Sequence, residues 1–180
     1  MNTGIFRWSA FATAMIIGSA GLAQDESTNR VAAETDWSVF VESDPTSCWS
    51  VSSPSESVNT KDGRVVAVRR GDILLFVSFI PSENAKGQVS FTGGYPFAPG
   101  SQVSLTIGEQ TFQLFTDTDT NKEMAWAPSD ADDAKITTAM KRGAQAVLQA
   151  RSARGTTTKD TFSLLGFTAA LEEAAGRCSG

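Results

Sequence analysis

The sequence predicts a mainly β protein: a single-domain β-sandwich or partly open barrel of about eight short strands with two peripheral helices. Short segments rich in β-branched and aromatic residues are separated by turn residues along most of the chain. Helical periodicity is found only toward the C-terminal end. The chain has 180 residues, of which 41% are hydrophobic and 19% charged, enough for one domain with a substantial core.

Residues 1–23 have the features of a secretory signal peptide. Arg7 supplies a positive charge, an apolar stretch follows it, and Gly21 and Ala23 are small residues that suit cleavage. The apolar stretch is about 15 residues, whereas a membrane-spanning helix needs about 20, so a retained anchor is the less favoured alternative. We expect a mature chain that begins near Gln24, has no transmembrane segment and is periplasmic or secreted.

The first strands follow a short polar segment. Residues 24–34 are polar and aperiodic, which predicts a flexible lead-in, and residues 35–180 are predicted to form the β-rich domain. Residues 37–42 show the alternation of a half-buried strand, and residues 48–52 continue it after a turn. Residues 52–63 have few large apolar side chains and are predicted to be a loop.

The middle of the chain contains the most apolar strand. Residues 64–70 and 72–80 are rich in β-branched and aromatic residues and are joined at Gly71, which predicts two strands or one bulged strand. The second is apolar on both faces, as expected of a central strand. Residues 87–91 predict another strand, which leads into the Pro- and Gly-rich segment 93–101.

Two hairpins are predicted in the second half. Residues 102–107 and 110–115 are strands joined by a two-residue connection that begins with Gly108, which suits a type II′ turn. Residues 144–152 and 156–165 predict the second hairpin.

Two segments have the signals of helices. Ser129 is a suitable N-cap and Gly143 a suitable stop for a helix over residues 130–142, with acids in its first turn. Residues 166–178 predict a short terminal helix. The residues expected to face inward are Ile136, Ala139 and Met140 in the first helix and Phe167, Ala170, Leu171 and Ala174 in the second.

The composition excludes several classes of function. Twenty acidic residues against fifteen basic ones give a net charge of -5, the wrong sign for a protein that binds nucleic acid. Histidine is absent from the sequence, which removes the usual catalytic base and the commonest zinc and copper ligand. No cofactor motif is present, so we expect no cofactor and no enzymatic activity.

The two cysteines, Cys48 and Cys178, both lie in the exported part of the chain. An even number of cysteines in an oxidising compartment favours a disulfide over free thiols or a metal site. The bridge would connect the first strands to the last helix. A CxxC motif is absent, which disfavours a thiol oxidoreductase.

Asp117, Asp119 and Asn121 form the D-x-D-x-N opening of a calcium-binding loop, which makes them weak candidates for metal binding. Lys122 and Pro128 stand where that motif requires Gly and Glu. A solvated acidic turn is therefore the favoured interpretation.

Two further groups of residues are candidates for binding. Tyr95, Phe97 and Trp126 could be exposed contact residues, although such aromatics more often fold back as a lid on the core. If the fold brings some of the clustered basic residues together, they could bind an anionic envelope partner, and otherwise they are solubilising charges. These clusters are Arg69 with Arg70, Lys141 with Arg142, and Arg151 with Arg154 and Lys159.

Three stretches together resemble one family. The segment DWSVFV at 36–41 with Cys48 shortly after it, the apolar strand at 72–80, and the segment at 140–171 that ends in SLLGFTAAL occur in the order of the invasion-associated-locus-B family of small exported bacterial proteins. The resemblance spans roughly residues 35–178. It implies a periplasmic or secreted β-rich domain and supplies no catalytic residues.

These observations favour a non-catalytic binding module whose partner is an envelope or host-surface protein or glycan. The alternatives are a carboxylate-dependent hydrolase or metal-dependent enzyme, and a small-ligand carrier. An enzyme would need converging carboxylates in a cleft, a carrier an apolar cavity, and a binding module an exposed patch with aromatic or basic anchors.

Overall fold

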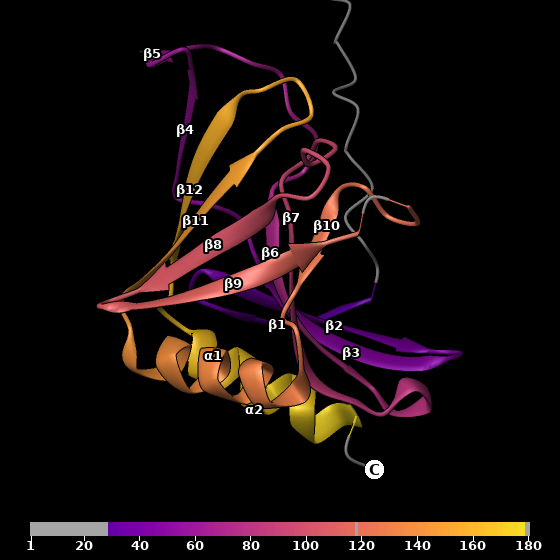
Figure 1. Ribbon diagram of the computed structural model, residues 1–180. Coiled ribbons are helices and arrows are strands. Elements are labelled where there is room, and N and C mark those ends of the chain that lie inside the picture. The colour runs from indigo at the N-terminus through magenta and orange to yellow at the C-terminus, as the bar shows by residue number, and fades with distance from the viewer. Residues whose placement is uncertain (1–28, 118, 179–180) are drawn as a thin grey trace, which may run out of the picture.

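A computed structural model describes residues 29–117 and 119–178 (Figure 1). The predicted signal peptide and the predicted start of the mature chain lie outside these residues. Residues Arg30–Glu34 form strand β1, so the predicted flexible lead-in does not extend to residue 34. The segment is ordered because it pairs antiparallel with β2 (Trp37–Ser43) and because Ala32 packs against the core.

The strands form one twelve-stranded sheet in the order β1-β2-β3-β6-β7-β10-β9-β8-β11-β12-β4-β5, and the pairings are antiparallel (Figure 1). The remaining strands are β3 (Thr46–Ser52), β4 (Glu56–Lys61), β5 (Arg64–Val65), β6 (Leu74–Ile80), β7 (Ala85–Thr92), β8 (Gln102–Ile107), β9 (Gln110–Thr116), β10 (Met124–Trp126), β11 (Gln145–Arg151) and β12 (Thr157–Ser163). The mainly β class with two helices is confirmed. The described residues form twelve strands, more than the predicted eight, because short or polar strands escape the hydrophobic pattern.

Strand β4 is the clearest departure from the sequence prediction. Its residues were predicted to be part of a loop, yet they pair with β12 from Glu56↔Thr161 to Thr60↔Thr157. Burial of apolar side chains contributes little to the stability of this polar strand. Backbone hydrogen bonds to β12, about 100 residues away in sequence, stabilise it instead. The predicted strand at 64–70 is reduced to the two residues of β5.

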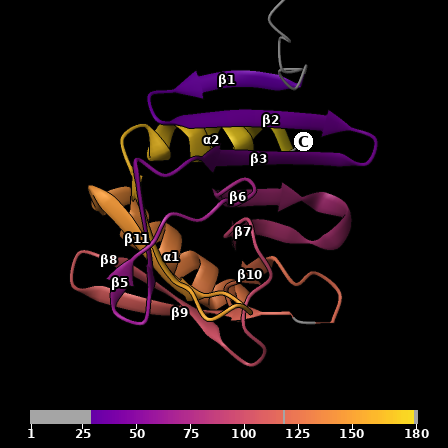
Figure 2. The same ribbon diagram turned by 90° about the horizontal axis from the view of Figure 1, so that it is seen from above.

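Two helices lie side by side on one face of the curved sheet, as Figures 1 and 2 show. They are α1 (Asp130–Arg142) and α2 (Phe167–Cys178), and a short 3₁₀ helix η1 (Pro81–Glu83) connects β6 to β7. The residues predicted to face inward are all buried. Ser129 caps α1 as predicted, since its Oγ accepts a hydrogen bond from the Asp132 amide.

Gly143 ends α1 for a different reason from the one predicted. Its φ is -83°, so it does not adopt the left-handed conformation of a typical glycine cap. A Cβ at this position would lie 2.6 Å from Cγ2 of Ile107 and 3.0 Å from Cδ1 of Leu164. Glycine therefore fits the tightly packed end of the helix without displacing the side chains of Ile107 and Leu164.

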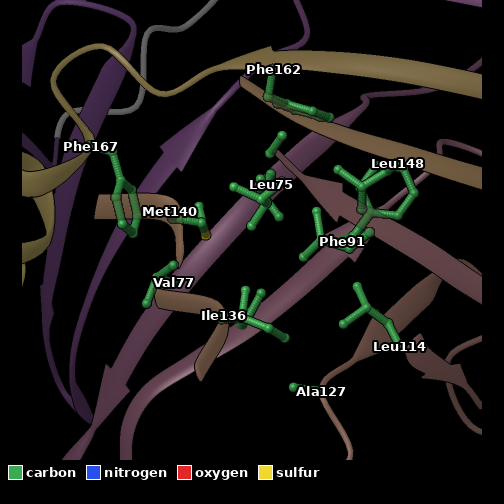
Figure 3. Close-up of a cluster of buried hydrophobic side chains, with 14 of the residues drawn as sticks. Leu75, Val77, Phe91, Leu114, Ala127, Ile136, Met140, Leu148, Phe162 and Phe167 are labelled. Atoms are coloured by element: carbon green, nitrogen blue, oxygen red, sulfur yellow. The ribbon is translucent and has the colours of Figure 1, made fainter. Parts of the chain in front are cut away.

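The core lies between the helices and the inner face of the sheet. Figure 3 shows Phe91 and Leu148 of the sheet near Ile136 and Met140 of α1. The predicted disulfide is present: Cys48 of β3 is bonded to Cys178 of α2, 130 residues apart in sequence. The bridge fixes the last helix to the N-terminal part of the sheet.

Candidate functional site

A hollow of about 300 Å³ lies where three connecting segments meet. These segments are residues 68–70 after β5, residues 94–96 after β7, and the β11–β12 connection at residues 152–156. The β11–β12 connection lies at the end of the sheet away from α1 and α2 (Figure 1). Glu123 and Thr158 complete the lining. We call this hollow the arginine pocket, because Arg69, Arg70 and Arg154 line it.

Two glycines bring the first two segments together. The Gly71 amide donates to the Gly94 carbonyl at 2.9 Å, and Arg70 Nε donates to the Gly93 carbonyl at 2.8 Å. Gly94 has a φ of 69°, and a Cβ on it would lie 2.5 Å from the Gly71 carbonyl oxygen. Only glycine allows this approach. The approach places Arg70 beside Tyr95.

Backbone contacts attach the third segment. The Ala153 amide donates to the Pro96 carbonyl at 2.9 Å, and Phe97 forms an isolated bridge with Ser152. The Thr156 amide donates to Oγ of Ser152 at 3.1 Å, which closes the hairpin connection. The three segments thus form one connected wall although they are distant in sequence.

A buried ion pair forms the base of the pocket. Arg70 donates through Nη1 to Oδ1 of Asp160 at 2.7 Å and through Nη2 to Oδ2 at 2.6 Å. The side chain of Asp160 is fully buried and that of Arg70 is 6% exposed. Ser57 Oγ donates a further hydrogen bond to Oδ1 of Asp160. Arg70 Nη1 also donates to Oδ1 of Asn59. This two-point contact fixes the plane of the Arg70 guanidinium.

Tyr95 lies between the ion pair and the core. The Arg70 guanidinium is 5.0 Å from the centre of the Tyr95 ring, a cation–π contact, and the Tyr95 hydroxyl shares a hydrogen bond with Oγ1 of Thr158. Burial raises the pKa of Tyr95 to about 12, against smaller lowering effects from Thr158 and Arg70. The phenol is therefore neutral near pH 7 and contributes a fixed polar group to the pocket.

Phe97 is a buried residue and not an exposed contact, in agreement with the interpretation that the sequence favoured. It is 2% exposed, and its ring packs against Tyr95 at 5.3 Å and Phe91 at 6.1 Å between ring centres. The Pro- and Gly-rich segment folds its aromatic side chains back toward the core, as in the lid interpretation.

Arg69 and Arg154 are the exposed cations of the pocket. Both side chains lie on its lining, and neither forms an ion pair or hydrogen bond through its side chain within residues 29–117 and 119–178. Glu123 is the acidic residue of the lining. Because Asp160 compensates the charge of Arg70, the two outer arginines make the pocket locally basic. This is unusual for a chain of net charge -5.

The other basic residues considered in the sequence lie elsewhere. Lys141 is 3.6 Å from Glu172 across the two helices, and Arg142 lies at the end of α1. Arg151 and Lys159 do not line the pocket. The fold therefore brings the Arg69–Arg70 cluster together with one member of the third cluster, Arg154.

The acidic segment forms a local turn. Oδ1 of Asp117 accepts hydrogen bonds from the amides of Asp119 at 2.8 Å and Thr120 at 3.2 Å, which hold the pKa of this carboxyl below its usual value. In the described part of the chain, no three Asp, Glu or Cys side chains converge as a metal site. The geometry gives Asp117 a turn-forming role, and metal binding by Asp119 and Asn121 stays a weak hypothesis.

Trp126 lies apart from the arginine pocket. It is half-buried on β10, with its ring 5.7 Å from that of Phe115, which is 43% exposed. Of the three aromatic contact candidates, Tyr95 lines the pocket, Phe97 is in the core and Trp126 stays a surface candidate.

The sequence did not predict that Asp160 lies buried beneath the pocket as the partner of Arg70. Thr158, Asp160 and Phe162 alternate inward along β12, so Asp160 shares the buried face of this strand. A carboxylate on the buried face of a strand needs a buried partner. The alternation along β12 was therefore the sequence signal that could have identified Asp160 as half of an ion pair.

The sequence matches the family model of the invasion associated locus B (IalB) protein over residues 37–175. The chain belongs to the IalB family. This range includes every segment of the arginine pocket. The fold of this IalB-family chain is also similar to the crystal structure of invasion associated protein B from Bartonella henselae, with a TM-score of 0.56 and 15% sequence identity. That alignment covers 83% of this chain and 98% of the other, and at this identity it concerns the fold alone.

A comparison with curated protein sequences finds no match to this IalB-family chain. Among its described residues, neither helix has the length and apolar character to span a membrane.

Proposed function

We propose that this IalB-family protein is an exported, non-catalytic binding module, and that the arginine pocket holds an anionic group of an envelope or cell-surface molecule. The observation that carries this proposal is the convergence of Arg69 and Arg154 on one hollow, where neither side chain has a partner among the residues that the structure describes. A guanidinium binds carboxylate, phosphate or sulfate through two parallel hydrogen bonds. Two of them from separate segments can hold one such group from two sides.

The rest of the pocket suits a ligand that arrives as part of a larger molecule. The hollow is about 300 Å³, the lower end of the usual range for small-molecule sites. This is room for one sugar ring or one phosphate ester. The base is rigid, because Arg70 is fixed by Asp160 and Tyr95, so little conformational entropy is lost there on binding.

The charges of the pocket also set a limit on the ligand. Glu123 shares the lining with the two outer arginines and disfavours a second negative charge beside the first. It accepts hydrogen bonds from hydroxyl donors instead. The favoured ligand class is a hydroxyl-bearing group with a single negative charge, such as a uronic acid or a sialic acid.

Isothermal titration of the exported chain with glucuronate, N-acetylneuraminate and glucose tests the proposal. The two acids are expected to bind and glucose is not. Arg69→Gln and Arg154→Gln are each expected to weaken binding by about tenfold or more, since each removes one charged contact. Arg142→Gln removes the same charge at the end of α1 and is the matched control. Equal affinity for glucose, or equal loss in the control, contradicts the proposal.

A further inference from the structure

The outer face of the sheet, opposite the helices, carries a row of aromatic residues. Along β2, β3 and β6, alternate residues point to the core, and their neighbours Phe40, Trp49 and Phe76 are half-buried. Phe40 pairs with Trp49 across β2 and β3, and their rings are stacked with centres 5.8 Å apart and planes 8° apart. Phe76 lies on β6 next to this stack, opposite Val51. We call this surface the aromatic face.

Two hollows flank Trp49 and Phe76, which line both of them. The first, of about 650 Å³, reaches from Phe40 toward residues 52–55. The second, of about 480 Å³, reaches toward β10 and Met124. The same two aromatic side chains line both hollows, so the hollows are neighbours on one face of the sheet, and we call the two together the groove.

Most polar side chains of this groove are hydroxyls, and Asn121 adds one amide. Its serines and threonines include Thr35, Ser38, Ser47, Ser52, Ser53, Ser55, Ser78, Ser90, Thr92 and Ser163. Within residues 29–117 and 119–178, the hydroxyls of Ser38, Ser47 and Ser78 have no hydrogen-bond partner. Each hollow has one charged residue, Asp36 in the first and Glu123 in the second, and the lining of neither contains Lys or Arg.

We infer that the aromatic face binds a neutral polysaccharide. The C–H faces of sugar rings stack on aromatic side chains, while their hydroxyls exchange hydrogen bonds with serine hydroxyls and with a carboxylate such as Asp36. The lack of cations in the lining disfavours an anionic polymer. A protein partner is also disfavoured, since serine is depleted at protein interfaces and dominates the polar part of this groove.

This inference does not depend on the arginine pocket. The two sites share Glu123, but the aromatic residues and free hydroxyls of the groove do not line the pocket. The groove adds a site for an uncharged glycan chain to a site for a single acidic group.

Electrophoresis in native gels that contain laminarin, galactomannan or hydroxyethylcellulose tests the inference. We expect at least one of these neutral polysaccharides to retard the exported chain. Trp49→Ala and Phe76→Ala are each expected to weaken the affinity measured from the retardation by about tenfold, because each removes an aromatic ring that the sugar would cover. Trp126→Ala is the matched control, because Trp126 is also half-buried on the sheet but lines neither hollow. Circular dichroism confirms that each variant is folded.

Three results would overturn the inference. The first is that none of the three polysaccharides retards the chain. The second is that Trp49→Ala and Trp126→Ala behave alike. The third is that sedimentation shows a dimer that Trp49→Ala dissociates, which would assign the face to a second copy of the chain. Arg69→Gln and Arg154→Gln should leave the retardation unchanged, so failure of this inference can be distinguished from failure of the arginine pocket.

Discussion

Arg70 and Asp160 are 90 residues apart in sequence and form a two-point ion pair in which both side chains are almost inaccessible to solvent. The pair connects the segment after β5 to β12 and supports the Tyr95 ring. A buried pair of this kind contributes little net stability, but the loss of one partner leaves an unpaired charge in the interior.

Asp160→Asn is therefore expected to lower the free energy of unfolding by about 3–5 kcal/mol. The Arg70 guanidinium would be left buried without its counter-charge. Urea denaturation followed by circular dichroism measures the effect. Lys135→Gln, at the exposed pair with Asp132, is the control and should change stability little. Similar losses in the two variants would show that the buried pair has no special role.

Gly94→Ala is expected to be more destabilising than Gly100→Ala. The two glycines have nearly the same φ, 69° and 70°, so the conformational strain of alanine is similar. A Cβ on Gly94 meets the Gly71 carbonyl at 2.5 Å, whereas nothing lies within 4 Å of one on Gly100. The clash is expected to cost about 1–3 kcal/mol more in unfolding free energy. Equal losses would argue against the close approach of the two segments.

Tyr95 is the only tyrosine in the sequence, so its titration can be followed directly by ultraviolet absorbance. Tyr95 in the folded protein should ionise with a pKa of about 12, and in denaturant near its ordinary value of 10.0, because burial disfavours the phenolate. The stability that the buried neutral phenol contributes is complete below pH 10.0 and is lost as the pH rises toward 12. A single transition near pH 10.0 in the folded protein would place Tyr95 in solvent.

The buried carboxyl of Asp133 should make the protein less stable as the pH rises from 3.8 through the raised pKa of this group. Burial raises its pKa above 3.8, although its Oδ1 accepts a hydrogen bond from the Val89 amide at 2.7 Å, and Asp130 and Asp132 raise it further. The folded state favours the protonated carboxyl. The stability that this carboxyl contributes is therefore complete below pH 3.8 and is lost as the pH rises past its raised pKa.

Chemical denaturation of Asp133→Asn across this pH range measures that contribution. The variant should gain stability relative to the native chain as the pH rises, since its amide oxygen can still accept from Val89. Glu109→Gln, at an exposed acid in the connection between β8 and β9, is the control. An unchanged difference between Asp133→Asn and the native chain at all pH values would contradict the assignment.

Local patterns predicted most of the fold. The α1 helix, the two hairpins and the inward residues of α2 follow from caps, turn residues and periodicity, which act over a few positions. The cysteine count predicted the bridge between Cys48 and Cys178. Strand β4 was missed because its pairing with β12, not its own pattern, orders it.

The binding site was less predictable. The arginines were visible as clusters, but their convergence depends on the contact between Gly71 and Gly94 and on the pairing of Ala153 with Pro96. These are tertiary contacts between segments that carry no shared sequence signal. The buried position of Phe97, by contrast, agrees with the lid interpretation that the sequence favoured for its segment.

The central claim, that Arg69 and Arg154 hold one anion, is tested most directly by nuclear magnetic resonance of the ¹⁵N-labelled protein during titration with inorganic phosphate at constant ionic strength. The Nε–Hε signals of Arg69 and Arg154, and the amides of the three pocket segments, should shift together along one saturable curve while the signal of Arg142 stays in place. Shifts of the same size at Arg142, or a linear response without saturation, would show that phosphate only screens the surface and would contradict the account.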